Sequence, residues 1–372
     1  MEAPERLIVE LGTRSYPILI GAGLLDRAGD LLAPMVPLRR AMVVTDANLA
    51  RTPHPGRLTA ALDRAGIVSR MLVVPAGEGS KSWARLQQVV DALLDFGVER
   101  RDVAIALGGG VIGDLVGFAA AVTLRGIHFV QIPTTLLAQV DSAVGGKTGI
   151  NTPRGKNLVG AFHQPKVVLI DTAVLGDLPA RELRAGYAEV VKYAVIRDAD
   201  GFFSWLEAHG AAVLAGDPAA RAEAIRRSLQ VKAAIVAADE HEMSGERALL
   251  NFGHTFAHAY EALAGYGGEL LHGEAVAIGM VDALALSVRL GLCPLVERNR
   301  VRRHLAQMGL PTRIGEVTAR RFAPEDLLVV MRRDKKVVDT RVRFVLARGI
   351  GAAFTGAEAP EAAVRAVLAE DG

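Results

Sequence analysis

The fold of this chain is constrained most by a change of sequence pattern near residue 178. Before that point, short apolar runs rich in β-branched residues alternate with segments of helical periodicity such as 82–96. The runs that predict buried strands are 43–46, 71–74, 102–107, 129–132 and 167–170. Alternation of strands and helices is typical of a parallel sheet covered by helices, so we predict an α/β domain over residues 1–178.

After residue 178 the strand pattern gives way to helical periodicity. Ala, Leu, Glu and Arg recur at helical spacing in 181–195, 219–238, 248–263 and 273–290. We therefore predict an all-helical domain over residues 179–372, with one late strand at 341–346. No repeat and no low-complexity linker separates the two halves, so the boundary is placed to within about ten residues.

Charge and cysteine content limit the classes of partner. The 372 residues carry a net charge of only +2, which does not favour nucleic acid or an anionic membrane. Cys293 is the only cysteine, which excludes an internal disulfide and a cysteine-based zinc site. Glu2, Glu5 and Glu10 interrupt the start of the chain, and no uncharged apolar stretch reaches about 18 residues. We expect a cytoplasmic protein.

A glycine-rich turn follows the predicted strand at 102–107. Gly108, Gly110 and Gly113 match the pattern G-x-G-x-x-G, in which glycines admit a pyrophosphate close to the backbone at a helix N-terminus. This predicts a Rossmann-like cofactor site, although glycines at a strand end also form plain tight turns. The turn lies a third of the way along the chain, whereas the usual fingerprint lies in the first strand–helix–strand unit.

The segment 139–160 concentrates charged and amide side chains among glycines. Residues 145–148 (GGKT) resemble the end of a phosphate-binding P-loop, but Asp141 stands where that motif needs its first glycine, which excludes a nucleoside triphosphate site. Two interpretations remain, a solvated loop or a site for an anionic ligand. The residues concerned are Asp141, Lys147, Asn151, Lys156 and Asn157.

Three histidines and a glutamate suggest a divalent metal site in the helical half. His254 and His258 lie four residues apart and share a helix face, His272 opens the next helical run, and Glu189 lies on an earlier one. Two imidazoles and a carboxylate leave coordination positions open for a substrate. Spacing alone favours His254 with His258 as ligands, while the structural alternative is a set of surface or core histidines.

The order of the motifs resembles the 3-dehydroquinate synthase family within the sugar phosphate cyclases. The resemblance covers essentially the whole chain. It rests on GGGVIGD (108–114), RGI (125–127), QIPTTLLAQVDS (131–142), GGKT (145–148), GKN (155–157), AEVVKY (188–193), LNFGHT (250–255), HGEAV (272–276) and DKKV (334–337).

The resemblance implies an NAD-binding α/β domain and a helical domain that binds one divalent ion, zinc or cobalt. It implies conversion of the sugar phosphate 3-deoxy-arabino-heptulosonate 7-phosphate to 3-dehydroquinate and phosphate, a step of the shikimate route to aromatic amino acids. NAD would be reduced and reoxidised within one turnover. The resemblance also implies a homodimer.

The resemblance further implies roles for individual residues. The metal ligands would be Glu189, His254 and His272, which moves His258 from ligand to proton transfer beside the metal. The catalytic set would be His258, Glu242, Lys147 and Arg125. The substrate would be held by Arg125, Asp141, Asn157, Lys192, Lys232, Arg247, Asn251 and one of Lys335 and Lys336, for which we favour Lys336. NAD would contact Asp46, Glu78, Lys81, Gly109, Gly110, Asp114, Thr134, Thr135, Lys147 and Lys156.

One departure and three alternatives accompany this interpretation. Asp177 replaces a threonine expected near NAD, where a carboxylate suits a ribose hydroxyl better than a pyrophosphate. The first alternative is a sister cyclase acting on another sugar phosphate, although Asn251 and His258 match the dehydroquinate pattern. The second is a metal-dependent alcohol dehydrogenase that releases NADH, and the third is a non-catalytic ligand sensor.

Overall fold

The computed structural model describes residues 3–35, 37, 40–265, 268–333, 337–338 and 341–371. Lys335 and Lys336 lie outside these ranges, so the predicted substrate lysine is not placed. By the contacts among its residues, the chain divides into two compact units. The first unit comprises Met1–Pro179 and Arg221–Ala237, and the second comprises Ala180–Ala220 and Ala238–Gly372.

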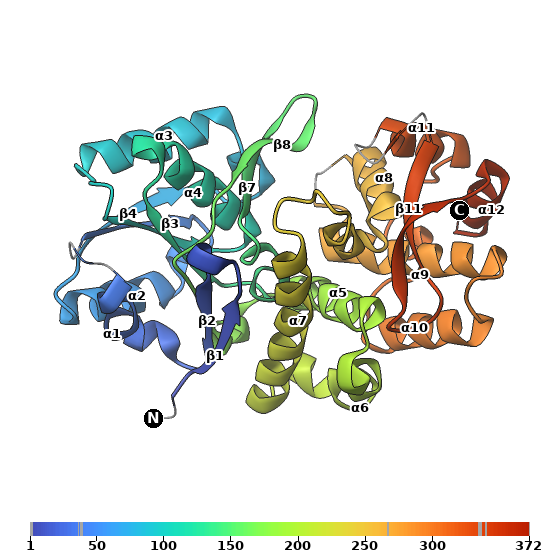
Figure 1. Cartoon of the computed structure of the whole chain (residues 1–372), viewed down its shortest axis with the longest axis horizontal. Helices are drawn as coiled ribbons and strands as arrows, with labels where there is room; N and C mark the ends of the chain where they lie inside the picture. Colours follow the sequence, from blue (N-terminus) through green and yellow to red (C-terminus); the bar gives the residue numbers. More distant parts are fainter. Residues whose placement is uncertain are drawn as a thin grey trace. The chain divides into compact units, whose positions relative to one another are not determined.

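The first unit is built on a seven-stranded sheet of order β1-β2-β9-β6-β5-β3-β4 (Figure 1). Its strands are β1 (Glu5–Val9), β2 (Tyr16–Gly21), β3 (Arg40–Asp46), β4 (Val68–Val74), β5 (Val103–Gly108), β6 (His128–Pro133) and β9 (Val167–Asp171). Only the β1–β2 pair is antiparallel. The five predicted strands are confirmed as β3, β4, β5, β6 and β9, whereas β1 and β2 were missed.

Two apolar cores cover opposite faces of this sheet, because successive side chains of a strand point to opposite sides. On one face, Val43 and Ile105 pack with helices α1 (Ala28–Leu32) and α2 (His54–Arg64). On the other, Val44 and Ala104 pack with helices α3 (Trp83–Asp95) and α4 (Gly110–Val122). The predicted helix at 82–96 is confirmed as α3.

The path of the chain creates a switch point between β3 and β5. These strands are parallel neighbours, but the helix after β3 covers one face and the helix after β5 covers the other. Connections that leave in opposite directions open a crevice at the carboxyl ends of such strands, where α/β sheets bind ligands. The glycine turn 108–110 ends β5 at this edge.

A separate hairpin follows β6. A π-helical turn (Ala138–Ser142) leads into antiparallel strands β7 (Lys147–Thr152) and β8 (Gly155–Phe162). In Figure 1 the tip of this hairpin extends beyond the helices of the first unit. The segment 139–160, for which a loop was one interpretation, is therefore largely regular structure.

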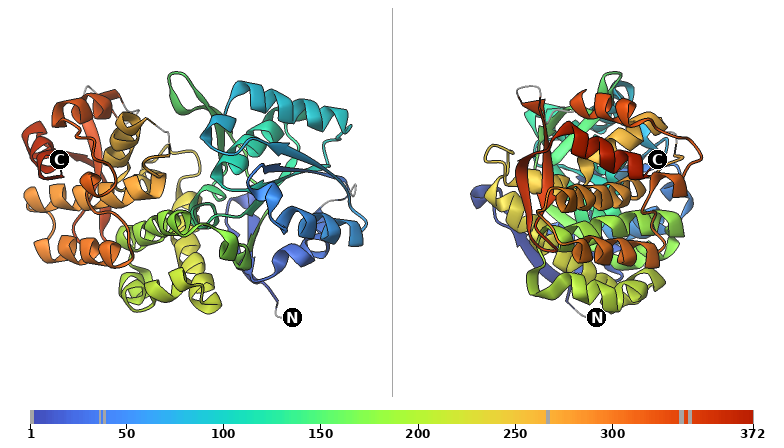
Figure 2. Two further views of the ribbon diagram at one scale, coloured as in Figure 1. Left: turned by 180° about the vertical axis from the view of Figure 1, so that it is seen from behind. Right: turned by 90° about the vertical axis from the view of Figure 1, so that its right-hand side faces the viewer.

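The second unit is mainly helical. It contains α5 (Ala180–Ile196), α6 (Phe202–Ala215), α8 (His254–Ala264), α9 (His272–Arg289), α10 (Leu295–Gln307), α11 (Pro324–Arg333) and α12 (Glu361–Asp371). A small sheet of β10 (Val337–Val338), β11 (Arg341–Ala347) and β12 (Ala353–Glu358) accompanies them. Helices α9 and α10 lie side by side in both views of Figure 2. Helix α7 (Pro218–Ala238) has most of its length in the first unit.

These observations confirm the predicted fold class and refine its details. The late strand is confirmed as β11, and it belongs to a three-stranded sheet that an all-helical prediction omits. The helix predicted from residue 248 begins only at His254, because Gly253 has a left-handed φ of 79°. Within the described residues, no helix is long and apolar enough to cross a membrane.

Candidate metal centre and cofactor residues

Three predicted ligand side chains meet in the second unit. Glu189 comes from the middle of α5, His254 is the first residue of α8, and His272 is the first residue of α9. One ligand atom from each lies within 4.8 Å of the others. Oε1 of Glu189 lies 3.7 Å from Nε2 of His254 and 3.6 Å from Nε2 of His272.

Glycine contacts between helices bring these side chains together. A Cβ on Gly273 would lie 1.8 Å from the carbonyl oxygen of Ala185, so only glycine lets α9 start this close to α5. A Cβ on Gly279 would lie 2.3 Å from the carbonyl oxygen of Gly253, which fixes α9 against the start of α8. The two contacts place His272 beside Glu189 and His254.

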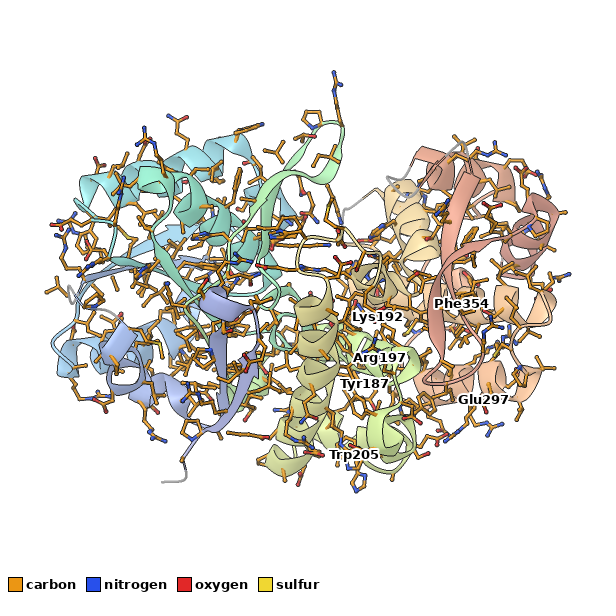
Figure 3. The ribbon with its side chains drawn as sticks, viewed as in Figure 1. Tyr187, Lys192, Arg197, Trp205, Glu297 and Phe354 are labelled. Carbon is orange, nitrogen blue, oxygen red and sulfur yellow. The ribbon has the colours of Figure 1, made fainter. Side chains whose placement is uncertain are left out.

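The carboxylate of Glu189 fits a metal ligand. The residue is fully buried, so its carboxylate depends on neighbouring side chains rather than on water for stabilisation. Lys192 on the same helix forms an ion pair with Oε2, and Figure 3 labels this lysine. Oε1 is left facing two imidazole nitrogens. Zinc bonds of about 2.0–2.1 Å in a tetrahedron separate ligand atoms by about 3.4 Å, close to the spacing here.

The orientation of both imidazoles also fits a cation. Nδ1 of His254 lies 3.1 Å from the carbonyl oxygen of Phe252, and Nδ1 of His272 lies 3.2 Å from Oε2 of Glu261. Both partners only accept, so each Nδ1 carries a proton and each ring turns its Nε2 towards Glu189, as a metal-binding histidine does. Lone pairs and a carboxylate at this spacing repel unless a proton or a metal ion lies between them.

Glu261 is a functional candidate that sequence reasoning missed. It is buried on α8 and orients His272. Burial lowers the pKa of His272, but the carboxylates of Glu189 and Glu261 outweigh burial and raise this pKa to about 10. A carboxylate behind a histidine ligand is a common requirement, yet spacing does not tell which glutamate supplies it.

His258 lies beside the three residues without joining them. Its ring centroid is 5.4 Å from that of His254 and 6.4 Å from that of His272. The ligand pair favoured by spacing, His254 with His258, is therefore not the grouping that the structure forms with Glu189.

The remaining candidates of the second unit lie on a loop held by one carboxylate. Asp239 accepts backbone N–H groups of Met243, Ser244, Gly245 and Arg247 at 2.7–3.2 Å. These hydrogen bonds outweigh burial and lower the pKa of Asp239 to about 2. The loop carries exposed Glu242 at a φ of 59°, and it leads into the short helix Arg247–Asn251, which holds the other two candidates.

In the first unit, the glycine turn joins β5 to α4 as predicted. A Cβ on Gly109 would lie 3.1 Å from Cγ2 of Thr135, and one on Gly110 would lie 2.8 Å from Oγ of Ser142. Packing against Thr135 and Ser142 therefore already favours glycine at both positions, so the glycines by themselves do not identify a cofactor site. The N–H of Thr134 bonds to the carbonyl oxygen of Gly108 at 3.0 Å, which places both threonines at the turn.

Charged candidates of the first unit are paired with one another. Lys81 donates to Oδ2 of Asp114 at 2.6 Å and contacts the amide oxygen of Asn157. Burial raises the pKa of Asp114, although Lys81 opposes this. Lys232 forms an ion pair with Asp141 and also donates to its carbonyl oxygen at 2.6 Å.

Other predicted residues lie at the ends of elements. Lys147 is exposed at the start of β7, Lys156 is half-buried on β8, and Arg125 is exposed at a φ of 65°. Asp46, at the end of β3, accepts the N–H groups of Asn48 and Leu49.

Asp177, the departure noted in the sequence, has a partner in the first unit. Its Oδ2 lies 3.0 Å from Nε2 of buried His54. The carboxylate therefore faces a side chain that becomes a cation on protonation. Sequence reasoning gave no sign of this pair.

The chain is similar to known proteins along most of its length. Residues 71–185 match the family described as 3-dehydroquinate synthase N-terminal, and residues 186–337 match 3-dehydroquinate synthase C-terminal. The 3-dehydroquinate synthase of Rhodospirillum rubrum is 59% identical over 363 residues, covering 97% of this chain and 94% of that protein. The enzyme of the same name from Jannaschia sp. is 56% identical, with 97% of each chain covered.

A solved structure agrees in fold. The 2-epi-5-epi-valiolone synthase of Streptomyces hygroscopicus, with NAD+ and Zn2+ bound, superposes with a TM-score of 0.86 at 32% identity. The match covers 100% of this chain and 99% of that one. Together with the family matches along 71–337, these similarities establish that the chain belongs to the 3-dehydroquinate synthase family.

Proposed function

We propose that this chain converts 3-deoxy-arabino-heptulosonate 7-phosphate to 3-dehydroquinate and phosphate. The observation that carries the proposal is the buried carboxylate of Glu189, which faces His254 and His272 in a chain 59% identical to a 3-dehydroquinate synthase. The reaction begins by oxidising a substrate hydroxyl, and a site of this composition suits a cation that acidifies such a hydroxyl.

We assign the metal, zinc or cobalt, to Glu189, His254 and His272. NAD is assigned to the carboxyl edge of the sheet at the β3–β5 switch point, where Asp46 and the glycine turn end their strands. The full proposed NAD set is Asp46, Glu78, Lys81, Gly109, Gly110, Asp114, Thr134, Thr135, Lys147 and Lys156. When bound, NAD would accept and return a hydride while the metal ion polarises the oxidised hydroxyl.

The chain itself supplies fixed positive charge. Lys192, Lys232 and Arg247 are each less than 5% exposed, so their ammonium and guanidinium groups need little reorganisation to stabilise a departing phosphate. The proposed substrate set is Arg125, Asp141, Asn157, Lys192, Lys232, Arg247, Asn251 and Lys336. Lys147 and Arg125 belong to both the binding and the catalytic sets.

Proton transfer is assigned to His258, beside the three ligand residues, with Glu242 as a second candidate. The substrate phosphate is a further proton acceptor, which accounts for the lack of a dedicated strong base in the proposal. His258 would also assist ring opening and the final aldol closure.

The proposal extends to organisation and location. We propose an NAD-binding domain at 1–178 and a metal- and substrate-binding domain at 179–372. We also propose a homodimer in the cytoplasm, without a nucleic-acid or membrane partner. The lone, buried Cys293 suits a reducing compartment.

The test is phosphate release from the heptulosonate phosphate, with and without a chelator. We expect release that the chelator abolishes and that zinc or cobalt restores, without net accumulation of NADH. Accumulation of NADH without phosphate release would instead indicate an alcohol dehydrogenase. Binding of NAD and metal without turnover would indicate a sensor.

The sister cyclase is tested in the same assay with other sugar phosphates, such as glucose 6-phosphate, of which a carba analogue is bound in a solved 2-deoxy-scyllo-inosose synthase. Identities of 54–59% to 3-dehydroquinate synthases, against 32% to the valiolone synthase, favour the heptulosonate. Faster turnover of any other sugar phosphate would overturn the substrate assignment.

A further inference from the structure

We propose that Asn151 is a positioning residue that couples the NAD-binding loop around Glu78 and Lys81 to the substrate residue Asn157. The inference rests on the proposed function for the roles of those three residues. Its geometry stands independently, within the first unit. Asn151 lies near the end of β7 and has no role in the catalytic or binding sets above.

Three hydrogen bonds start or end at Asn151. Its Nδ2 donates to Oε1 of Glu78 at 2.7 Å, and its Oδ1 accepts the backbone N–H of Asn157 at 2.9 Å. Its own backbone N–H donates to the carbonyl oxygen of Lys81 at 2.8 Å. The amide group therefore joins the loop before α3 to strand β8.

The local backbone explains how the side-chain amide of Asn151 reaches both Glu78 and Asn157. The β7–β8 register shifts between Ile150 and Thr152, so Asn151 lies at an irregularity in the ladder. Such irregularities redirect a side chain away from the regular pattern of the hairpin. Asn157 opposite adopts a left-handed φ of 54°, a conformation that asparagine tolerates better than most residues.

These contacts close a ring. Asn157 contacts the ammonium of Lys81, which lies 3.8 Å from Oε1 of Glu78, the same oxygen that Asn151 holds. Lys81 in turn donates to Asp114. A shift of Asn151 therefore moves cofactor residues and a substrate residue together, although Asn151 need not touch either ligand.

The variant Asn151→Ala tests the coupling. It removes both side-chain hydrogen bonds and keeps the backbone bond to Lys81. We expect about a tenfold rise in the Kd for NAD, the size of effect typical of losing a hydrogen bond to a charged group. The KM for the heptulosonate phosphate should rise with it, while the metal content stays at the wild-type level.

Thr152→Val is the matched control. Thr152 lies next to Asn151, and its hydroxyl bonds within the hairpin turn, to Gly155 and Arg154. If Asn151 only stabilises the hairpin, Asn151→Ala and Thr152→Val should both lower Tm and leave the Kd for NAD unchanged. Positioning predicts a weaker Kd in Asn151→Ala alone, measured well below Tm.

Exchanging the hydrogen-bond donor and acceptor between Asn151 and Glu78 tests whether their contact supports NAD binding. Asn151→Asp alone sets a carboxylate against Glu78 and should weaken NAD binding more than Asn151→Ala. Adding Glu78→Gln gives an amide that donates to the new carboxylate, whose second oxygen still accepts from Asn157. The double variant should bind NAD more tightly than Asn151→Asp.

The outcomes separate this inference from the proposed function. Wild-type protein that neither binds NAD nor releases phosphate would overturn the proposed function and, with it, this inference. Active wild-type protein with unchanged Kd and KM in Asn151→Ala would overturn the role of Asn151 alone. So would a double-mutant cycle, including Glu78→Gln alone, that shows no coupling between positions 78 and 151 in NAD binding.

Discussion

The two units treat their buried charges differently. In the first unit, Lys81 is bonded to Asp114 and Lys232 to Asp141, so these cations already have anionic partners within the chain. In the second unit, Oε1 of Glu189 faces Nε2 of two imidazoles across 3.6–3.7 Å, and Lys192 pairs with its other oxygen. A self-paired network forms without a ligand, whereas a converging set of electron donors is stabilised by a cation from outside.

The largest expected effect comes from Glu189→Gln. Metal content should be lost and turnover should fall at least about 1,000-fold, a barrier change of about 4 kcal/mol. The metal-free variant should still fold, but with a lower Tm than metal-free wild type, because the amide leaves buried Lys192 without its anionic partner. Metal analysis, phosphate release and Tm measure these outcomes.

Glu223→Gln is the control for this substitution, since Glu223 is paired with Arg226 on α7 and belongs to none of the proposed catalytic or binding sets. Full metal content in Glu189→Gln would refute the ligand assignment.

A second effect concerns acid stability away from the metal residues. His304 is buried in the second unit, 3.0 Å from the hydroxyl of Tyr187, which is labelled in Figure 3. Burial lowers the pKa of His304 to about 4, although Glu207 opposes this. The unfolded chain, with a pKa of about 6.5, then binds the proton first, so stability is full above pH 6.5 and is lost as the pH falls to about 4.

The loss from this group amounts to about 3 kcal/mol over that window. Urea unfolding at several pH values should show a shallower acid dependence in His304→Gln than in wild type. The same slope in both proteins would mean that His304 is not buried as a neutral group.

Breaking a pair in the first unit should also lower stability, but at residues outside the proposed metal ligands. Lys232→Met leaves the partly buried carboxylate of Asp141 without its cation, so the free energy of unfolding should fall by about 2 kcal/mol. Adding Asp141→Asn should recover part of the loss. A double-mutant cycle without coupling would show that the first unit does not depend on internal pairing.

The smallest expected effect concerns Glu261, which orients His272 in the second unit. Glu261→Gln keeps an oxygen that accepts from His272 but removes the charge behind the imidazole, so metal affinity should weaken about tenfold. Competition with a chromophoric chelator measures this. An unchanged affinity would reduce Glu261 to a packing residue.

How far the sequence predicted the fold depends on what surrounds each element. Strands such as β5 are buried on both faces, so their continuous apolar runs were recognisable. β1 was missed because it is half exposed, with Glu5 and Arg6 at its start. β2 is mostly buried, but Pro17 near its start is typical of an edge or a turn rather than of a strand interior. The β7–β8 hairpin was missed because its glycines and polar residues give no strand pattern.

The candidate site shows a similar limit. The i, i+4 spacing pointed to His254 with His258, but the side chains that meet come from three helices. Their meeting depends on helix crossings that no local spacing reveals. Family resemblance selected Glu189, His254 and His272 instead, and the structure brings these three together, while their role as ligands stays a proposal.

The glycine at position 273 has a wider consequence. Because a single methyl group there would collide with the backbone of α5, the distance between Glu189 and His272 depends on a residue that has no side chain to contribute. The positions around this centre that tolerate mutation least should therefore include those where two helix backbones come into contact. A substitution at such a position can abolish metal binding although Glu189, His254 and His272 are all still present.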